Sequence, residues 1–164
     1  MTPPDHAASD PAAADELARR CAEVMWADDE ASRRLGMTLD RVGSGRATLS
    51  MAVRADMTNG HGTAHGGFIF ALADSAFAFA CNSHNERTVA QACDIVFAQP
   101  AREGDVLVAD ATERHRFGRN GIYDVRVTCA DRVVAEFRGR SRTVGEALVD
   151  GAQPLQVSVE DGGT

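Results

Sequence analysis

The sequence predicts an α+β fold in which an antiparallel β-sheet wraps around one long, buried helix. Residues 68–81 are Phe, Ile, Leu, Ala and Cys apart from Asp74 and Ser75, so a helix there would be apolar on every side. In the rest of the chain, apolar residues mostly alternate with polar ones, as in half-buried strands. A sheet of such strands needs an apolar partner for one face, and this helix supplies it.

Length and composition indicate a single globular domain. The chain has 164 residues, of which 44% are hydrophobic and 25% charged. A formal net charge of -7 argues against a nucleic-acid binder. The apolar run is too short for a bilayer span and contains a carboxylate, so we expect no membrane segment. The first residues lack a basic stretch and a continuous apolar run, so we expect no secretory signal and a cytoplasmic protein.

A helix and a β-hairpin precede the buried helix. Residues 1–13 are rich in Pro, Ala and Asp and predict a disordered tail. From Ala14 apolar residues recur at helical spacing, up to an acidic run at 28–30 that predicts a turn or a solvated face. Two strands are expected at 37–42 and 46–54, joined by glycines in a hairpin.

Four strands follow the buried helix, which we expect to occupy residues 65–82. A turn signal at 118–121 and a second turn at 130–131 separate the later strands. From Gly145 onward, acidic residues among Gly and Pro predict a loose tail, so the domain is expected at 14–145 and the tail at 146–164. The four expected strands are 88–99, 106–117, 121–129 and 132–144.

Asp74 is the one formal charge of the buried helix. A buried carboxylate must find a partner, or its pKa rises and it stays protonated. Asp74 is therefore either structural, bonded to backbone amides or an arginine, or functional. The loop before the helix favours function, because it is dense in glycine, histidine and asparagine and leads into the helix N-terminus, where unpaired amides stabilise developing negative charge.

The helix rise separates these two features. Gly66 and Asp74 are eight residues apart, about 12 Å along the axis at ~1.5 Å per residue. One chain therefore cannot place both at the same reacting carbonyl. If both act on one substrate, Asp74 comes from a second copy whose helix packs antiparallel in a two-fold dimer.

Four segments around the helix form a pattern: Asn59-Gly60-His61, His65-Gly66-Gly67, Leu72-Ala73-Asp74-Ser75-Ala76-Phe77-Ala78 and Phe137-Arg138-Gly139-Arg140-Ser141. Its most specific part is an Asn six residues before a His-Gly-Gly sequence, with an Asp nine residues after the His. This pattern resembles that of the hotdog-fold acyl-CoA thioesterases of the phenylacetate-degradation (PaaI) type. The resemblance covers roughly residues 20 to 145.

The resemblance implies hydrolysis of an acyl-CoA thioester, with aryl- or arylacetyl-CoA as the substrate class. Asp74 would be general base or nucleophile, a choice the sequence leaves open. The Gly66 amide would hold the oxyanion. His65 and Asn59 would orient the carbonyl or the water, and Ser75 would either assist the water or make an ordinary intrahelical bond. No separate cofactor is expected, because coenzyme A is part of the substrate.

Coenzyme A carries phosphates, and an acidic protein needs a local basic surface to bind them. Between Arg114 and Arg142 there are eight arginines against three acids, a local charge of +5. These arginines are either phosphate ligands or the solvated outer faces of edge strands. The resemblance places the nucleotide near the turn at 118–121. The candidate ligands are Arg116, Gly118, Arg119, Asn120, Arg138 and Arg140.

Other chemistries have weaker support. His61, His65 and Asp74 could suggest a metal site, but the glycines between the histidines make a shared helix improbable, so no metal is expected. No G-x-S-x-G motif or obvious catalytic cysteine is present, and the four cysteines are expected to be reduced core residues. Two alternatives stay open: a hotdog enoyl-CoA hydratase or dehydratase, and a non-catalytic acyl-CoA-binding module.

The expected assembly is a homodimer with active sites at its interface, paired into a homotetramer. Aromatic substrate preference follows from the resemblance. The four phenylalanines at 68, 70, 77 and 79 hint at it, although such positions on an apolar helix are expected to be core.

Overall fold

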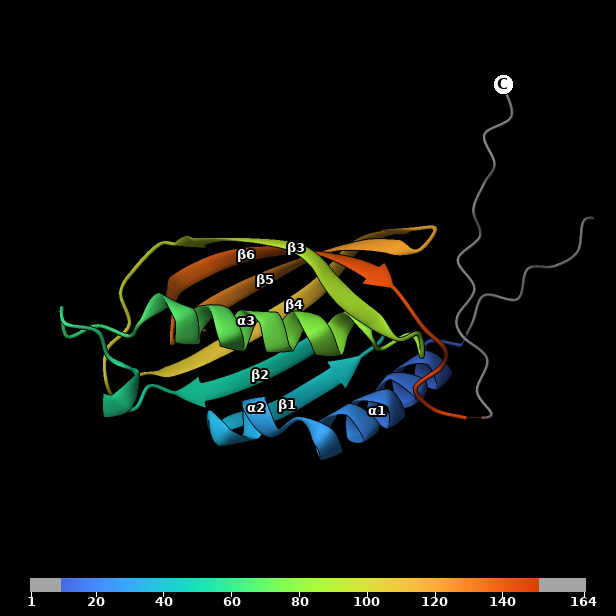
Figure 1. The fold of residues 1–164 in the computed structure, drawn as a ribbon, viewed down its shortest axis with the longest axis horizontal. Coiled ribbons are helices and arrows are strands. Elements are labelled where there is room, and N and C mark those ends of the chain that lie inside the picture. Colours follow the sequence, from blue (N-terminus) through green and yellow to red (C-terminus); the bar gives the residue numbers. More distant parts are fainter. Residues whose placement is uncertain (1–9, 151–164) are drawn as a thin grey trace, which may run out of the picture.

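The structure, a computed structural model that describes residues 10–150, confirms the predicted architecture. Six antiparallel strands in the order β1-β2-β4-β5-β6-β3 curl around helix α3, Gly66–Cys81 (Figure 1). No helix within the described residues is long and apolar enough to cross a membrane. The strands are β1 Met37–Gly43, β2 Arg46–Ala52, β3 Thr88–Phe97, β4 Val106–Phe117, β5 Asn120–Cys129 and β6 Arg132–Thr143.

The core lies between α3 and the concave face of the sheet. Leu72 and Ala76 of α3 are fully buried, as are Leu107 and Val125 of the central strands. Gly139 of β6 is required for this packing, because a Cβ at that position would lie 2.7 Å from the ring of Phe77. The helix therefore packs closely against the concave face of the sheet, while residues such as Ala71 and Asp74 on its other side are only half-buried.

The first helix, α1 (Pro11–Asp28), begins three residues earlier than the sequence suggested. The Asp10 side chain caps it by accepting a hydrogen bond of 3.0 Å from the Ala12 N–H, and proline suits the first helical position. Residues 11–13 of the expected tail are thus helical, while residues 1–9 lie outside the described part. The acidic run ends α1 and starts a short helix, α2 (Glu30–Arg34), which the sequence did not predict.

The chain after β6 is also attached to the domain. The N–H groups of Leu148 and Val149 donate to Asn85 Oδ1 at 2.9 and 2.8 Å. Residues 148 and 149 of the expected loose tail therefore contact the domain, and residues 151–164 lie outside the described part.

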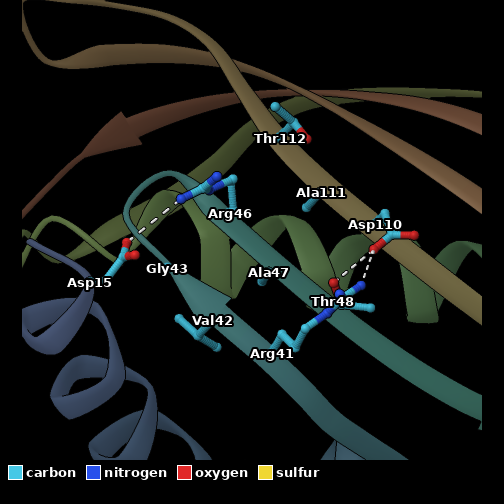
Figure 2. A pocket seen from close by; sticks show the side chains of 10 residues that line it. All are labelled: Asp15, Arg41, Val42, Gly43, Arg46, Ala47, Thr48, Asp110, Ala111 and Thr112. Atoms are coloured by element: carbon cyan, nitrogen blue, oxygen red, sulfur yellow. Dashed lines mark hydrogen bonds and ion pairs between the residues drawn. The ribbon is translucent and has the colours of Figure 1, made fainter. Parts of the chain in front are cut away.

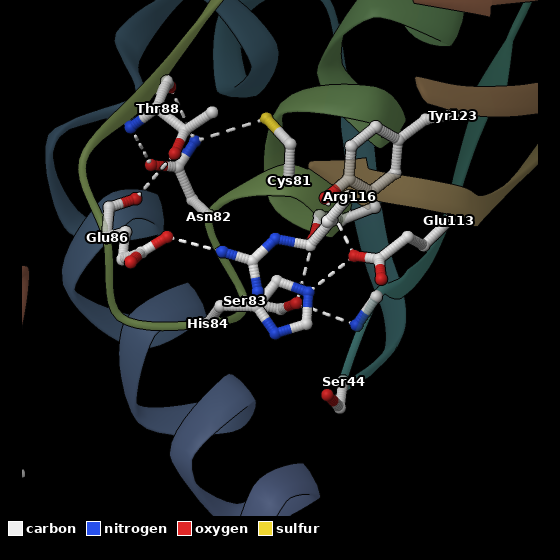
Figure 3. A network of polar contacts seen from close by, with 12 residues as sticks. Ser44, Cys81, Asn82, Ser83, His84, Glu86, Thr88, Glu113, Arg116 and Tyr123 are labelled. Carbon is white, nitrogen blue, oxygen red and sulfur yellow. Dashed lines mark hydrogen bonds and ion pairs between the residues drawn. The ribbon is translucent and has the colours of Figure 1, made fainter. Parts of the chain in front are cut away.

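A buried polar cluster joins the C-terminal end of α3 to β4 and β5 (Figure 3). His84 Nε2 lies 2.5 Å from Glu113 Oε2, and the Tyr123 hydroxyl donates to the same oxygen at 2.8 Å. Arg116 pairs with Glu86 beside them. Burial raises the pKa of Glu113, but the contacts with His84 and Tyr123 outweigh it and hold this pKa below its ordinary value. Glu113 therefore stays ionised and fixes the end of α3.

Glu113→Gln should lower the free energy of unfolding at pH 7 by about 1–3 kcal/mol, because the amide replaces a charged acceptor of two buried donors. The folded-state pKa of Glu113 is depressed, so its contribution is complete above the ordinary glutamate value of about 4.3 and is lost as the pH falls through the lower folded-state value. Urea denaturation at pH 7 and at acidic pH measures both effects. Glu136→Gln, which breaks an exposed pair with Arg126, is the matched control. Equal losses in the two variants would contradict the assignment.

Candidate active site

The N-terminal end of α3 presents an unpaired backbone amide. The Gly67 N–H donates to His65 Nδ1 at 3.0 Å, and the Phe68 N–H donates to the His65 carbonyl oxygen at 3.0 Å. Within residues 10–150 no acceptor contacts the Gly66 N–H. The helix dipole adds partial positive charge at this end, so the amide is suited to bind a developing oxyanion.

His65 is the N-cap of α3, and this position sets its chemistry. Because Nδ1 accepts the Gly67 N–H, a neutral His65 ring carries its proton on Nε2. The ring is exposed and packs edge-on against Phe68, with 6.2 Å between centroids. His65 can therefore donate a hydrogen bond from Nε2 to a carbonyl or a water molecule near Gly66.

Asn59 organises the loop that precedes α3. Its Oδ1 accepts hydrogen bonds from the His61 N–H at 2.9 Å and the Thr63 N–H at 3.3 Å, and its Nδ2 lies 3.0 Å from Thr63 Oγ1. Gly62 closes the turn with a φ of +71°, a conformation that favours glycine. The Asn59 side chain is thus engaged within its own loop, where it shapes the approach to Gly66.

An open cleft of about 430 Å³ lies at this end of α3, lined by residues 63–64, Gly66, Ile69 and residues 97–101. The ring of Phe97, from the end of β3, lies against Gly66: a Cβ on Gly66 would be 2.9 Å from Phe97 Cζ. The glycine therefore keeps the cleft open beside the amide. The sequence did not single out Phe97, because this contact exists only when β3 crosses the start of α3.

Asp74 is half-buried in the middle of α3, and burial raises the pKa of its carboxyl group. Its eight-residue separation from Gly66 on one regular helix leaves the two groups about 12 Å apart along the axis. Asp74 is also not among the residues that line the cleft at Gly66. One chain thus carries both groups, but it does not bring them to the same point.

Ser75 contacts a different element. Its hydroxyl lies 2.8 Å from the Ser32 hydroxyl on α2. The pair attaches α2 to α3.

The expected coenzyme A ligands occupy two surfaces. Arg138 donates to Asp124 at 2.7 and 2.9 Å, and Arg140 to Asp94 at 3.1 Å, both across the outer face of the sheet. The Arg116 side chain is only 11% exposed and pairs with Glu86. These three arginines therefore already have carboxylate partners.

The turn between β4 and β5 holds the other three expected ligands, Gly118, Arg119 and Asn120. Arg119 Nε donates to the Thr143 carbonyl oxygen at 3.1 Å, and Gly118 has a φ of +53°. This turn and Gly66 lie at opposite ends of α3 (Figure 1). Within one chain, the structure does not bring the turn and the amide together.

Two further hollows lie away from these residues. One, of about 340 Å³, lies beside the β1–β2 hairpin, where Thr48 donates to Asp110 at 2.7 Å (Figure 2). A wider groove of about 810 Å³ runs between α1 and β1 and includes Trp26 and Leu39. Neither contains an expected site residue.

Within residues 10–150 there is no group of three or more His, Cys, Asp or Glu side chains that could hold a metal ion.

Comparison with known proteins identifies the family of this chain. Residues 61–136 match the family described as the Thioesterase superfamily. The chain is 41% identical over 128 residues to the acyl-coenzyme A thioesterase PaaI of Escherichia coli K12, covering 77% of this chain and 91% of that protein. It is 31% identical to a putative esterase of Archaeoglobus fulgidus, covering 80% and 86% of the two chains.

Solved structures give the same result. The structure of the E. coli PaaI protein from the phenylacetic acid degradation operon matches with a TM-score of 0.80 and 40% identity, covering 81% of this chain and 97% of that one. The phenylacetic acid degradation protein PaaI from Thermus thermophilus, solved as a point mutant, matches with a TM-score of 0.69 and 37% identity, covering 71% and 100%. The sequence relationship and the shared hotdog architecture show that this chain belongs to the thioesterase superfamily.

Proposed function

We propose that the protein hydrolyses aryl- or arylacetyl-CoA thioesters to the free acid and coenzyme A. The observation that carries the proposal is the unpaired Gly66 N–H at the start of α3, which opens into a cleft, together with a half-buried carboxylate on the same helix. The similarity to the acyl-coenzyme A thioesterase PaaI supports the thioester as substrate, and the name of the phenylacetic acid degradation operon supports the aromatic acyl group.

Gly66, His65 and Asp74 have separate roles in the proposed reaction. The Gly66 amide and the α3 dipole stabilise the negative charge that forms on the thioester oxygen, and His65 Nε2–H supplies a second donor. As general base, Asp74 takes a proton from water while the water oxygen attacks the acyl carbon; the C–S bond then breaks, and the proton passes from Asp74 to the sulfur, so coenzyme A leaves as the thiol. As nucleophile, the Asp74 carboxylate attacks the acyl carbon, the C–S bond breaks and coenzyme A leaves as the thiolate, and water then hydrolyses the mixed anhydride to the free acid and the Asp74 carboxylate. Both routes require an ionised Asp74.

The site is completed by a second copy of the chain. β3 is an edge strand, and Val89, Val96 and Phe97 on it are 47%, 65% and 50% exposed. Pairing two such edges about a two-fold axis would cover these apolar side chains and lay the two α3 helices antiparallel. Asp74 of one subunit would then lie near Gly66 of the other. Assembly of these dimers into a tetramer stays a prediction.

An aromatic acyl group fits the surface beside Asp74. Phe70 lies one helical turn before Asp74 and is half-buried, and its ring meets Phe137 edge-on at 5.4 Å between centroids. Phe77 and Phe79 are buried core residues, whereas Phe68 and Phe70 keep part of their surface exposed. An acyl ring next to Phe70 would extend this edge-to-face arrangement.

The turn between β4 and β5 is our candidate for contact with the coenzyme A phosphates. Arg119 uses Nε for Thr143, and its terminal nitrogens make no hydrogen bond or ion pair within residues 10–150. Arg138 and Arg140 would have to exchange their carboxylate partners for phosphate, so we expect them to contribute less than Arg119.

Asp74→Asn should lower kcat by about three orders of magnitude or more while the oligomer stays folded, because the amide can neither accept a proton nor attack. In the wild type, kcat/KM should fall as the pH drops through a value above the ordinary aspartate pKa, since burial raises the pKa of Asp74 and only its ionised form is active. Release of the coenzyme A thiol from a panel of CoA esters measures both.

The same panel tests the alternatives. Loss of the crotonyl-CoA double bond without thiol release would indicate a hydratase. Thermal stabilisation by intact esters without any turnover would indicate a binding module. Full activity of Asp74→Asn would remove this residue from the mechanism.

Gly66→Pro should lower kcat by roughly two to three orders of magnitude, because proline removes the N–H yet is tolerated at the first helical position. His65 has φ -64° and ψ 130°, which is compatible with a following proline. Gly66→Ala is the matched control: it adds the Cβ that meets Phe97 but keeps the amide. If alanine costs as much as proline, crowding rather than the lost donor explains the effect.

Mixing Asp74→Asn subunits with Gly66→Pro subunits should restore activity. Each mixed dimer contains one site with an intact glycine and an intact aspartate, so random exchange should recover about one quarter of wild-type activity per chain. Co-expression with two different affinity tags isolates the mixed species. Mixed dimers with no more activity than their parents would show that each chain forms its site alone.

A further inference from the structure

Cys93 is the side chain that contacts the Asp74 carboxylate within the described residues. Its Sγ lies 4.0 Å from Asp74 Oδ1, at the long end of the range for a hydrogen bond from a thiol. Within residues 10–150 no arginine, hydroxyl group or backbone amide makes a hydrogen bond to this carboxylate, and the neighbouring Ser75 hydroxyl is bonded to Ser32. A half-buried carboxylate needs such a donor to remain ionised.

A β-bulge in β3 places Cys93 there. The pairing of β3 with β6 shifts register between Ala90 and Ala92, so one extra residue is accommodated at Gln91. After the shift, Cys93 lies opposite Gly139, which faces α3, and Asp94 lies opposite Arg138 on the outer face. If the regular pairing of Ala90 with Ser141 continued without the extra residue, Cys93 would lie opposite Arg138 on the outer face. The bulge therefore turns Cys93 toward α3.

The thiol is neutral in this position. Burial raises the pKa of Cys93 to about 11, assisted by the charges of Asp74 and Asp94 and opposed by Arg140. At neutral pH, Cys93 thus carries its proton and can donate it to a carboxylate. The same protonation makes it a poor nucleophile.

Resting on the thioesterase function proposed above, we propose that Cys93 is a positioning residue that donates its thiol hydrogen to Asp74 and holds the carboxylate in its reactive orientation. The thiol forms no bond to the substrate. It restricts the rotation of the Asp74 side chain and stabilises its ionised form, which both the general-base and the nucleophilic route require.

Few other titratable groups influence Asp74. Cys81, at the C-terminal end of α3, also remains neutral, because burial raises its pKa to about 12. Asp94 on β3 and Arg140 on β6 form an ion pair with each other on the outer face of the sheet, and their charges influence the pKa of Cys93. The pKa of Asp74 is raised by burial, with no charged side chain of the other packed elements contributing. Cys93 is therefore the neighbour whose substitution should be visible in the titration of Asp74.

Cys93→Ala should lower kcat roughly three- to tenfold with little change in KM, as expected for loss of one weak hydrogen bond. It should also move the acidic limb of the kcat profile to higher pH, because the ionised carboxylate loses its donor. Cys93→Ser restores a donor, so it should recover kcat and move the limb back to the wild-type pH or below. Cys129→Ala removes a similarly half-buried thiol at the end of β5 and is the matched control, expected to leave both quantities unchanged.

A titration independent of turnover separates this proposal from the proposed function. The carboxyl carbon of Asp74, assigned by its loss in Asp74→Asn, can be followed by ¹³C NMR in the wild type, Cys93→Ala and Cys93→Ser. A higher Asp74 pKa in the alanine variant and its return in the serine variant would support the contact even if the wild type cleaved no CoA ester, in which case the proposed function alone would fail. Identical titrations in all three proteins would overturn the role of Cys93.

Discussion

The packing of α3 against the concave face of the sheet is the constraint on which the rest of this structure depends. An apolar helix of 16 residues needs an apolar partner, and the curved sheet supplies it for one side of the helix. Polar chemistry is left to the two ends of the helix and to the half-buried face beside the edge strand β3. The unpaired Gly66 amide occupies one end, the His84 and Glu113 cluster the other, and Asp74 the face between them.

Much of this architecture could be predicted from local patterns. The limits of α3 and of the strands agree with the expected ranges to within two residues at every end, because hydrophobic periodicity and glycine turns are encoded locally. The order of elements then leaves one apolar helix for one sheet. Local patterns did not show helix caps or the attachment of the C-terminal segment. Asp10 and Asp29 are the N-caps of α1 and α2, and Asn85 accepts hydrogen bonds from residues 148 and 149.

The sequence could nominate residues for the candidate site but not the partners that the structure gives them. The basic segment from 114 to 142 has a charge of +5 when counted along the chain, yet Arg116 and Arg140 pair with Glu86 and Asp94, which lie outside that segment. Ion pairs between strands depend on the register of the strands. That register depends on bulges such as the one in β3, and a bulge cannot be recognised from a local stretch of sequence. The same bulge turns Cys93 from the outer face of the sheet toward Asp74.

The exposed edge of β3 makes a single chain open to pairing with other extended peptides. An uncovered edge strand is a row of unsatisfied main-chain donors and acceptors, and here it also carries the apolar side chains of Val89 and Val96. A single folded chain would offer this row to any extended peptide. In the proposed dimer a second copy would cover it, so assembly of the site and resistance to aggregation would depend on the same ten residues.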